Sequence, residues 1–255
     1  MSARKKAAPA KPPTPAEKGR AATILRRLAK AYPDWGPTLR FSNAFELLVA
    51  TILAAQATDE SVNRVTEGLF KKYRGPRDYV QAPPAELEKD VHSLGFFRQK
   101  AKAVRLMSQG VLEKFGGEVP REVDRLTELH GVGRKTASIV AGGAYGVPSI
   151  AVDRHVARVA QRLGFVKPND PVKIEAAIAA RYPRGDWIKA TWCFVLHGRR
   201  TCTPTPQCPV CVVRDLCPYP FKTKALPATR ARPRSGARAP AGAGAGGSTP
   251  RSPSG

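Results

Sequence analysis

Apolar residues recur at three- and four-residue spacing through almost the whole interior of the chain, and this feature limits its fold more than any other. The pattern runs between about residues 19 and 225. It is clearest in six segments: Ile24–Leu28, Phe45–Leu53, Val62–Phe70, Val104–Leu112, Val156–Leu163 and Ile174–Ile178. This spacing gathers apolar side chains on one face of an α-helix. Glycine and proline interrupt the pattern at Gly75-Pro76, Pro83-Pro84, Gly116-Gly117, Pro168 and Pro183. The sequence therefore predicts an all-α protein.

Both ends of the chain differ in composition from this interior. Residues 1–19 carry five Lys/Arg against one Glu, and residues 226–255 carry five Arg and no acid among Pro, Ala, Gly and Ser. Segments with so few apolar residues cannot bury a core. We therefore expect disordered basic tails at residues 1–19 and 226–255.

The whole chain is strongly basic, with a formal net charge of +23, and most of this charge lies outside the tails. A polyanionic partner is expected, either nucleic acid or an anionic membrane surface. No apolar run approaches the ~18 residues that span a bilayer, and Met1–Arg20 lacks the hydrophobic stretch of a secretory signal. We therefore expect no membrane partner, a cytosolic location and reduced cysteines.

A glycine turn between two helices is the most informative local motif. Asp124 is a candidate N-cap for a short helix that ends near Leu129. Gly131 and Gly133 would allow a tight turn with positive φ, Val132 would pack the turn onto the core, and a second helix would begin near Arg134. The N–H groups at a helix start bind anions such as phosphate. An ordinary helical corner with glycine caps is the alternative, but Arg134 in a basic protein favours phosphate.

Lys135 and Asp153 are the candidate catalytic residues. Four residues mark the buried stripe of the helix after the turn: Ala137, Val140, Ala141 and Ala144. Lys135 lies roughly 200° from that stripe, beside the small residues Ser138 and Gly142. A solvated surface lysine would look the same. Asp153 precedes the apolar stripe of another helix, which predicts an N-cap, and an N-cap carboxylate can also be catalytic.

Four of the five cysteines form a compact set near the end of the helical interior, namely Cys202, Cys208, Cys211 and Cys217. Four thiolates can bind either a [4Fe–4S] cluster or a structural zinc ion, and spacing alone does not separate the two. Two disulfides are the third alternative. Cys193, between Trp192 and Phe194, is interpreted as a small core residue.

Several of these motifs, in this order, resemble the endonuclease III family. The segments that carry the resemblance are Phe45-Glu46-Leu47-Leu48, Ala55-Gln56-Ala57-Thr58-Asp59, His130–Ala137, Ile150–His155 and Leu196-His197-Gly198-Arg199. The resemblance covers roughly residues 20 to 220. It implies two helical domains: a helical barrel domain at 38–150 with a helix–hairpin–helix at 124–144, and a discontinuous iron–sulfur domain at 20–37 plus 151–225.

The resemblance also implies a function. Members of this family remove damaged, typically oxidised, pyrimidines from DNA and then nick the strand through a lysine Schiff base. The family's lysine falls on Lys135 and its aspartate on Asp153. Because a base inside the duplex is out of reach, it must be flipped out, and the residues that fill the gap match Gln56 and Phe96. The expected partner is double-stranded DNA with damaged bases or abasic sites, bound by a monomer in the bacterial cytosol or nucleoid.

The chain departs from the family pattern in two places. Phe96 stands where relatives carry leucine, which gives a stronger stacking wedge and bears on opposite-base preference. The interval between Cys202 and Cys208 has five residues in place of six and contains no Lys or Arg. The resemblance still implies a [4Fe–4S] cluster on the four cysteines, whose role is to fold this segment. Three arginines could replace the loop's missing phosphate contacts: Arg199, Arg200 and Arg214.

Two other functions compete with the bifunctional enzyme. One is a DNA-binding protein that uses the hairpin and the cluster as a scaffold without catalysis, and the pairing of Lys135 with Asp153 argues against it. The other is a monofunctional glycosylase of the related adenine-removing type. That group usually lacks the lysine and carries a further C-terminal domain, which we do not expect from the residues that follow Pro220.

Overall fold

The computed structural model describes residues 12–225, and within that range the regular structure is entirely helical. This confirms the all-α prediction. The elements are α1 (Pro15–Ala31), α2 (Ala44–Leu53), α3 (Asp59–Lys72), α4 (Pro76–Gln81), α5 (Pro84–Asp90), α6 (Phe97–Phe115), α7 (Val123–Leu126), α8 (Arg134–Tyr145), α9 (Arg154–Arg162), α10 (Pro171–Ala179), α11 (Trp187–Arg200), and the 3₁₀ turns η1 (Arg184–Asp186) and η2 (Cys208–Val210).

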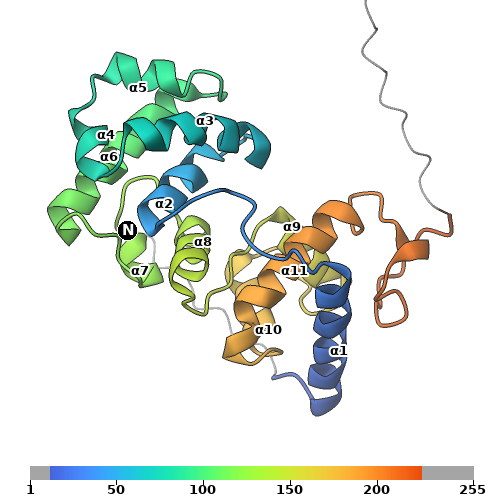
Figure 1. Cartoon of the computed structure of the whole chain (residues 1–255). Coiled ribbons are helices and arrows are strands. Elements are labelled where there is room, and N and C mark those ends of the chain that lie inside the picture. Colours follow the sequence, from blue (N-terminus) through green and yellow to red (C-terminus); the bar gives the residue numbers. More distant parts are fainter. Residues whose placement is uncertain (1–11, 226–255) are drawn as a thin grey trace, which may run out of the picture.

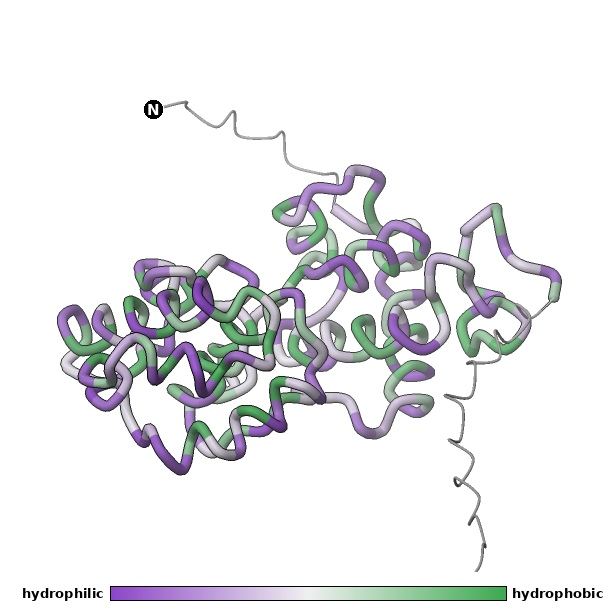
Figure 2. Tube along the Cα trace, turned by 90° about the horizontal axis from the view of Figure 1, so that it is seen from above, coloured by the Kyte–Doolittle hydropathy of each residue, from purple (hydrophilic) through white to green (hydrophobic). Residues whose placement is uncertain are grey.

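The helices are arranged around two separate hydrophobic cores (Figures 1 and 2). The first core draws its buried residues from the stretch between Phe45 and Ala141. The second draws them from α1 and from the stretch between Ile150 and Val213. We propose that the cores define two domains with the boundaries expected from the sequence. Residues 38–150 are called the barrel half below, and residues 20–37 with 151–225 the cysteine half.

The first helix begins earlier than the sequence prediction allowed. The predicted tail runs to residue 19, but α1 starts at Pro15, so the end of that segment is helical. A reciprocal capping box explains the start: the Thr14 hydroxyl accepts from the Glu17 N–H at 3.2 Å, and the Thr14 N–H donates to the Glu17 carboxylate at 2.7 Å. The remaining predicted tail residues, 1–11 and 226–255, lie outside the described residues.

Several prolines that interrupt the apolar pattern are helix starts. Pro76, Pro84 and Pro171 each occupy the opening of a helix, where the N–H that proline lacks would have had no partner. Gly116 ends α6 with φ of 64°, a left-handed conformation that glycine adopts without strain. Proline therefore sets the start of each of the short helices α4 and α5. The spacing of apolar residues in the sequence did not reveal these two helices.

The helix at the centre of the cysteine half, α11, was also missed by periodicity. Its residues from Cys193 to Gly198 are buried on consecutive positions, so the helix has no clear polar face in that stretch. It packs against α9 and α1. A helix surrounded by protein loses the 3.6-residue alternation that identifies a surface helix. In the described part of the chain, none of the helices combines the length and apolar character that crossing a bilayer requires.

Candidate active site

A cleft of about 1030 Å³ lies between the two halves and brings the principal predicted residues together. Lys135 and Gln56 reach it from the barrel half, and Asp153 from the cysteine half. Ser138 and Gly142, the small residues expected beside Lys135, line the same cleft. The cleft therefore unites side chains whose helices belong to different hydrophobic cores.

The glycine turn joins α7 to α8 much as the sequence predicts, with three differences. The helix before the turn, α7, ends at Leu126 and not near Leu129. Gly131 has φ of 74° and Val132 is buried, so the tight turn and its packing residue are confirmed. Gly133 has φ of −82°, so only the first glycine needs the left-handed region. Asp124 is not the N-cap: α7 begins at Val123, one residue before it, and Glu122 occupies the cap position without a side-chain bond.

The N-terminus of α8 presents its first N–H groups without a side-chain cap. Gly133 is the cap residue, and no side chain accepts a hydrogen bond there. Lys135 is the second residue of the helix and is exposed. An uncapped helix start carries a partial positive charge and free donors, which suits an anion. The expected helix start at Arg134 is confirmed.

Arg134, predicted to contact DNA, bridges the two halves. Its Nε and Nη2 donate to the two carboxylate oxygens of Glu175 on α10, both at 2.8 Å. Its Nη1 also lies 3.5 Å from the Asp124 carboxylate. These contacts, with the Glu175 hydrogen bond first, raise the pKa of Arg134 and keep it charged. This bidentate ion pair between Arg134 and Glu175 fixes the first turn of α8 relative to the cysteine half.

Asp153 is the N-cap of α9, as predicted. Its Oδ1 accepts from the N–H groups of His155 and Val156, each at 2.8 Å. The side chain is half-buried and lines the cleft. These two N–H donors at the helix start hold the carboxylate in a fixed position. A fixed carboxylate therefore lies on the wall of the same cleft as the Lys135 amine.

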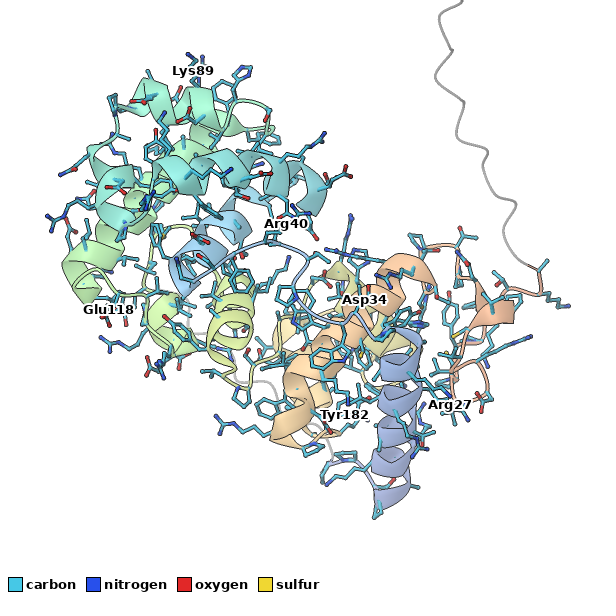
Figure 3. The ribbon with its side chains drawn as sticks, viewed as in Figure 1. Arg27, Asp34, Arg40, Lys89, Glu118 and Tyr182 are labelled. Atoms are coloured by element: carbon cyan, nitrogen blue, oxygen red, sulfur yellow. The ribbon has the colours of Figure 1, made fainter. Side chains whose placement is uncertain are left out.

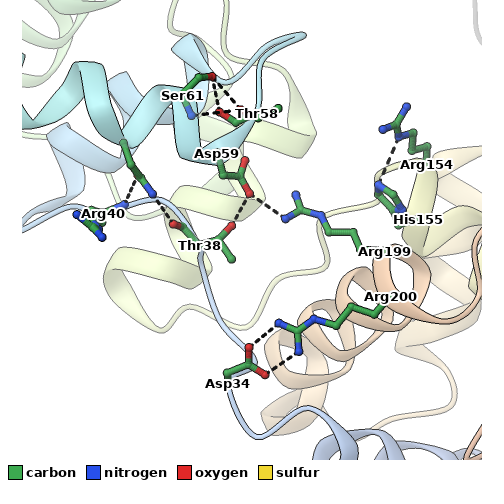
Figure 4. A network of polar contacts seen from close by, with 11 residues as sticks. Asp34, Thr38, Arg40, Thr58, Asp59, Ser61, Arg154, His155, Arg199 and Arg200 are labelled. Atoms are coloured by element: carbon green, nitrogen blue, oxygen red, sulfur yellow. Dashed lines mark hydrogen bonds and ion pairs between the residues drawn. The ribbon is translucent and has the colours of Figure 1, made fainter. Parts of the chain in front are cut away.

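A second carboxylate in the cleft, Asp59, was missed by the sequence analysis. It accepts hydrogen bonds from Thr38 and, at 2.8 Å, from Arg199 of α11, which again links the two halves (Figure 4). Partial burial raises its pKa, but these bonds and the charges of Arg199 and Lys135 outweigh burial and hold the pKa below its usual value. Asp59 belongs to a segment that carries the family resemblance, but an acidic residue in the first turn of a helix is ordinary, and its position in the sequence does not indicate a bond to the other half.

Gln56 and Phe96, the candidate gap-filling residues, share an unusual backbone conformation. Their φ angles are 55° and 59°, and they are the two non-glycine residues with positive φ in the stretch from 12 to 225. Both side chains are exposed, Phe96 to 58%. The left-handed region costs an ordinary residue roughly 1–2 kcal/mol. Phe96 is thus not docked on the core, and strained backbone at two exposed tips is typical of functional loops.

The four clustered cysteines line one cavity beside α9 and α11, and all five cysteines of the chain are free thiols. Arg162 donates to the Cys202 sulfur at 3.3 Å. Within the described residues, no three His, Cys, Asp or Glu side chains are arranged to hold a single metal ion. Cys193 is fully buried in the second core, as expected. The site thus consists of four soft sulfur donors around a common space.

The shortened interval after Cys202 is held by one arginine from outside it, Arg162. Arg162 donates to the carbonyl oxygens of Thr203 and Pro204 at 2.6 and 3.0 Å. Of the three arginines suggested as substitutes for phosphate contact, Arg199 is paired with Asp59 and Arg200 with Asp34, as Figure 4 shows. Arg214 is exposed.

Comparison with known proteins shows consistent similarity. Residues 49–184 match the family model described as HhH-GPD superfamily base excision DNA repair protein. The chain is 44% identical to endonuclease III of Bacillus subtilis over 195 residues, which cover 76% of this chain and 89% of the relative.

Two solved structures share the fold. One is a trapped endonuclease III–DNA covalent intermediate, with 42% identity, a TM-score of 0.75 and coverage of 79% of this chain and 96% of the other. The other is a thermostable thymine-DNA glycosylase, with 26% identity, a TM-score of 0.70 and coverage of 80% and 95%.

Proposed function

The chain belongs to the endonuclease III family of the HhH-GPD superfamily of base excision DNA repair proteins, and we propose that it removes oxidised pyrimidines from DNA and then nicks the strand. The observation that carries this proposal is the cleft shared by the Lys135 amine and the Asp153 carboxylate. An amine and a fixed carboxylate that line one cleft suit nucleophilic displacement at a sugar carbon.

Lys135 is the nucleophile in this proposal. Its uncharged Nζ attacks C1′ of the damaged nucleotide, the bond from C1′ to the base breaks, and the departing base takes up a proton. The sugar ring opens as the bond from C1′ to O4′ breaks and O4′ takes up the second proton of the amine, which leaves an imine between C1′ and Nζ. Loss of a proton from C2′ then expels the 3′-phosphate, and hydrolysis frees the lysine. A hydroxyl or carboxylate nucleophile cannot form this imine.

Asp153 is proposed to stabilise the positive charge that develops on the sugar and to accept the protons that the reaction releases. Positive charge develops on the sugar as the base departs, and a carboxylate fixed by two backbone N–H groups can stabilise it without reorganising. The same oxygen atoms can accept the protons that the reaction releases. Asp59, which is also in the cleft and feels the charge of Lys135, is tied to Arg199 and serves to hold the two halves together.

DNA binding is assigned to the hairpin and to the two strained tips. The uncapped N–H groups at Gly133 and Arg134 would bind a backbone phosphate, with Gly131 and Val132 setting the turn. Gln56 and Phe96 would enter the gap left by the flipped nucleotide. Their left-handed backbone and exposure support this role, because a wedge must extend from the surface.

The proposed cofactor is a [4Fe–4S] cluster on Cys202, Cys208, Cys211 and Cys217. Four free thiols around one cavity fit it, and the Arg162 guanidinium beside the Cys202 sulfur would offset thiolate charge. When bound, the cluster cross-links the segment from 201 to 225. A structural zinc ion is the alternative occupant of four cysteine ligands. Analysis of metal and inorganic sulfide content distinguishes zinc from a [4Fe–4S] cluster.

The proposed partner is duplex DNA with a damaged base or an abasic site, bound by a monomer in the bacterial cytosol. A basic interior and similarity to an endonuclease III–DNA complex support the DNA partner. The alternative function for the same cleft is a monofunctional glycosylase, in which water displaces the base and Lys135 forms no imine.

The test is a panel of duplexes that each carry one defined lesion. Base release and strand nicking are measured separately, by chromatography of free base and by gel without alkali. We expect both activities from the wild type and neither from Lys135→Gln, while Lys173→Gln on α10 behaves as wild type. Base release without nicking would establish the monofunctional enzyme. Binding with neither activity would overturn the proposed function.

A further inference from the structure

A buried histidine, His197, links α1 to the cysteine segment. The residue is only 2% exposed, and its Nδ1 lies 3.0 Å from the hydroxyl of Tyr32, the C-cap residue that follows α1. On its other side, Nε2 lies 3.8 Å from the Cys211 sulfur. The Tyr32 hydroxyl is in turn 2.8 Å from the Thr201 hydroxyl. These groups form one continuous row: Thr201, Tyr32, His197 and Cys211.

This row of hydrogen bonds can run in either of two directions. A neutral imidazole has one protonated nitrogen, and each hydroxyl has one proton to donate. A cysteine that binds a metal cluster has lost its proton and can only accept. The proton of His197 must then lie on Nε2, so that Nδ1 accepts from Tyr32 and the Tyr32 oxygen accepts from Thr201. A protonated Cys211 would permit the opposite direction.

We propose that His197 is a hydrogen-bond donor to the Cys211 thiolate, that Tyr32 fixes its proton on Nε2, and that this bond protects the cluster from loss. The inference rests on the proposed [4Fe–4S] cofactor. Hydrogen bonds to cluster sulfurs set reduction potential and stability, and groups behind a ligand orient it. Burial makes the bond effective, because water does not compete with the donor.

His197 also contacts the cysteine segment through its backbone. Its carbonyl oxygen accepts from the N–H of Thr201 at 2.9 Å and from the N–H of Cys202 at 2.7 Å. One residue therefore orients the first cysteine through its carbonyl and the third cysteine through its ring. Because Tyr32, the C-cap of α1, is a member of the row, the N-terminal helix would influence the cluster although it contributes no ligand.

The test compares two tyrosine variants in the full-length protein. Tyr32→Phe removes the hydroxyl that fixes the histidine proton. Tyr182→Phe is the matched control, because Tyr182 (labelled in Figure 3) is about equally buried in the same core, and its hydroxyl donates to the Ala21 carbonyl of α1 and not to a member of the row. The readouts are iron and sulfide content, the rate at which an oxidant bleaches the cluster's visible absorption, and the midpoint potential.

We expect Tyr32→Phe to bleach several-fold faster than the wild type and to show a more negative potential, while Tyr182→Phe matches the wild type in both. His197→Gln offers an amide donor that needs no tyrosine. In that background Tyr32→Phe should therefore add no further effect.

Two results would overturn the inference in distinguishable ways. In the first, the wild type contains iron and sulfide but the two tyrosine variants bleach at the same rate. The row of hydrogen bonds then has no effect on the cluster, while the proposal of a [4Fe–4S] cofactor is unaffected. If the wild type holds zinc or lacks inorganic sulfide, the cofactor proposal fails, and this inference falls with it.

Discussion

The two halves of the molecule place their site residues by different means. In the barrel half the backbone does so locally: Gly131 turns the chain, α8 starts beside Lys135, and Gln56 and Phe96 take left-handed conformations at loop tips. In the cysteine half, long-range bonds dominate. Arg20 of α1 donates to the carbonyl oxygens of Leu163 and Leu216 at 3.0 and 2.8 Å.

Arg158 makes the clearest of these long-range connections. From α9, whose cap is Asp153, it donates to the carbonyl oxygens of Cys202 and Gly198 at 2.8 and 2.7 Å. Gly198 allows α9 and α11 to touch, since a Cβ on it would lie 2.8 Å from the His155 Cβ. The position of Lys135 therefore depends mainly on local turns, whereas the position of Asp153 depends on contacts between segments distant in sequence, which the cysteine segment completes.

The largest effect is expected from loss of a cysteine ligand. Cys208→Ser should remove the cluster, and the segment 201–225, which has little regular structure, should lose its protection against hydrogen exchange. The α2–α8 helices should keep theirs. Cys193→Ala, which changes a core cysteine, should retain the metal. If residues 201–225 were equally protected against hydrogen exchange with and without metal, the cysteine half would not depend on the cluster, contrary to the difference between the halves described above.

A smaller effect is expected where α9 meets α11. Gly198→Ala forces a Cβ against His155, and we expect it to lower the free energy of unfolding by about 1–3 kcal/mol and to slow base release by shifting Asp153. Gly68→Ala on α3 has open space and should instead stabilise by about 0.5–1 kcal/mol. Thermal unfolding and single-turnover rates measure both, and an unimpaired Gly198→Ala would show that the helix contact is dispensable.

The strained tip of the barrel half gives the next prediction. Phe96→Gly should leave stability within about 1 kcal/mol of wild type, because relief of left-handed strain offsets the greater chain entropy of glycine. Preference for lesion-containing over undamaged duplex should fall, since the wedge is gone. Phe221→Gly, which removes another exposed phenylalanine, should keep that preference. Competition binding assays test this, and unchanged preference in Phe96→Gly would remove its assigned role.

The smallest effect concerns the bridge between Asp59 and Arg199. The pKa of Asp59 is lowered in the fold, so its contribution to stability is complete above the unfolded value of about 3.9 and is lost as pH falls through the folded value. The stability difference between wild type and Asp59→Asn should therefore be constant from neutral pH down to about 5 and shrink in stronger acid. Urea unfolding at several pH values measures it, and a difference that vanishes near neutrality would contradict the bridge.

Much of the structure of the barrel half could be predicted from the sequence, because the residues that determine it are close together in the chain. Helical spacing, the Gly131 turn, the helix start at Arg134 and the core position of Val132 were all predicted and found. Asp153 as an N-cap was equally readable. Asp124 was misassigned because α7 begins one residue earlier, a difference within the usual uncertainty of helix ends.

The rest could not be read because it depends on residues distant in sequence. The bonds from Arg158 to Cys202 and from Arg134 to Glu175 span 44 and 41 positions, and no periodicity reports them. Burial hid α11 by removing its polar face. Asp59 looked like an ordinary acidic residue at a helix start, and its link to the other half appears only in three dimensions.

Borohydride trapping on duplex DNA with an abasic site tests the central claim most directly, because it asks whether the amine on one half attacks the sugar. We predict a covalent adduct whose peptide map places the sugar on Lys135, no adduct with Lys135→Gln, and a slower one with Asp153→Asn. An adduct formed equally well by Lys135→Gln, or mapped to another lysine, would contradict the account.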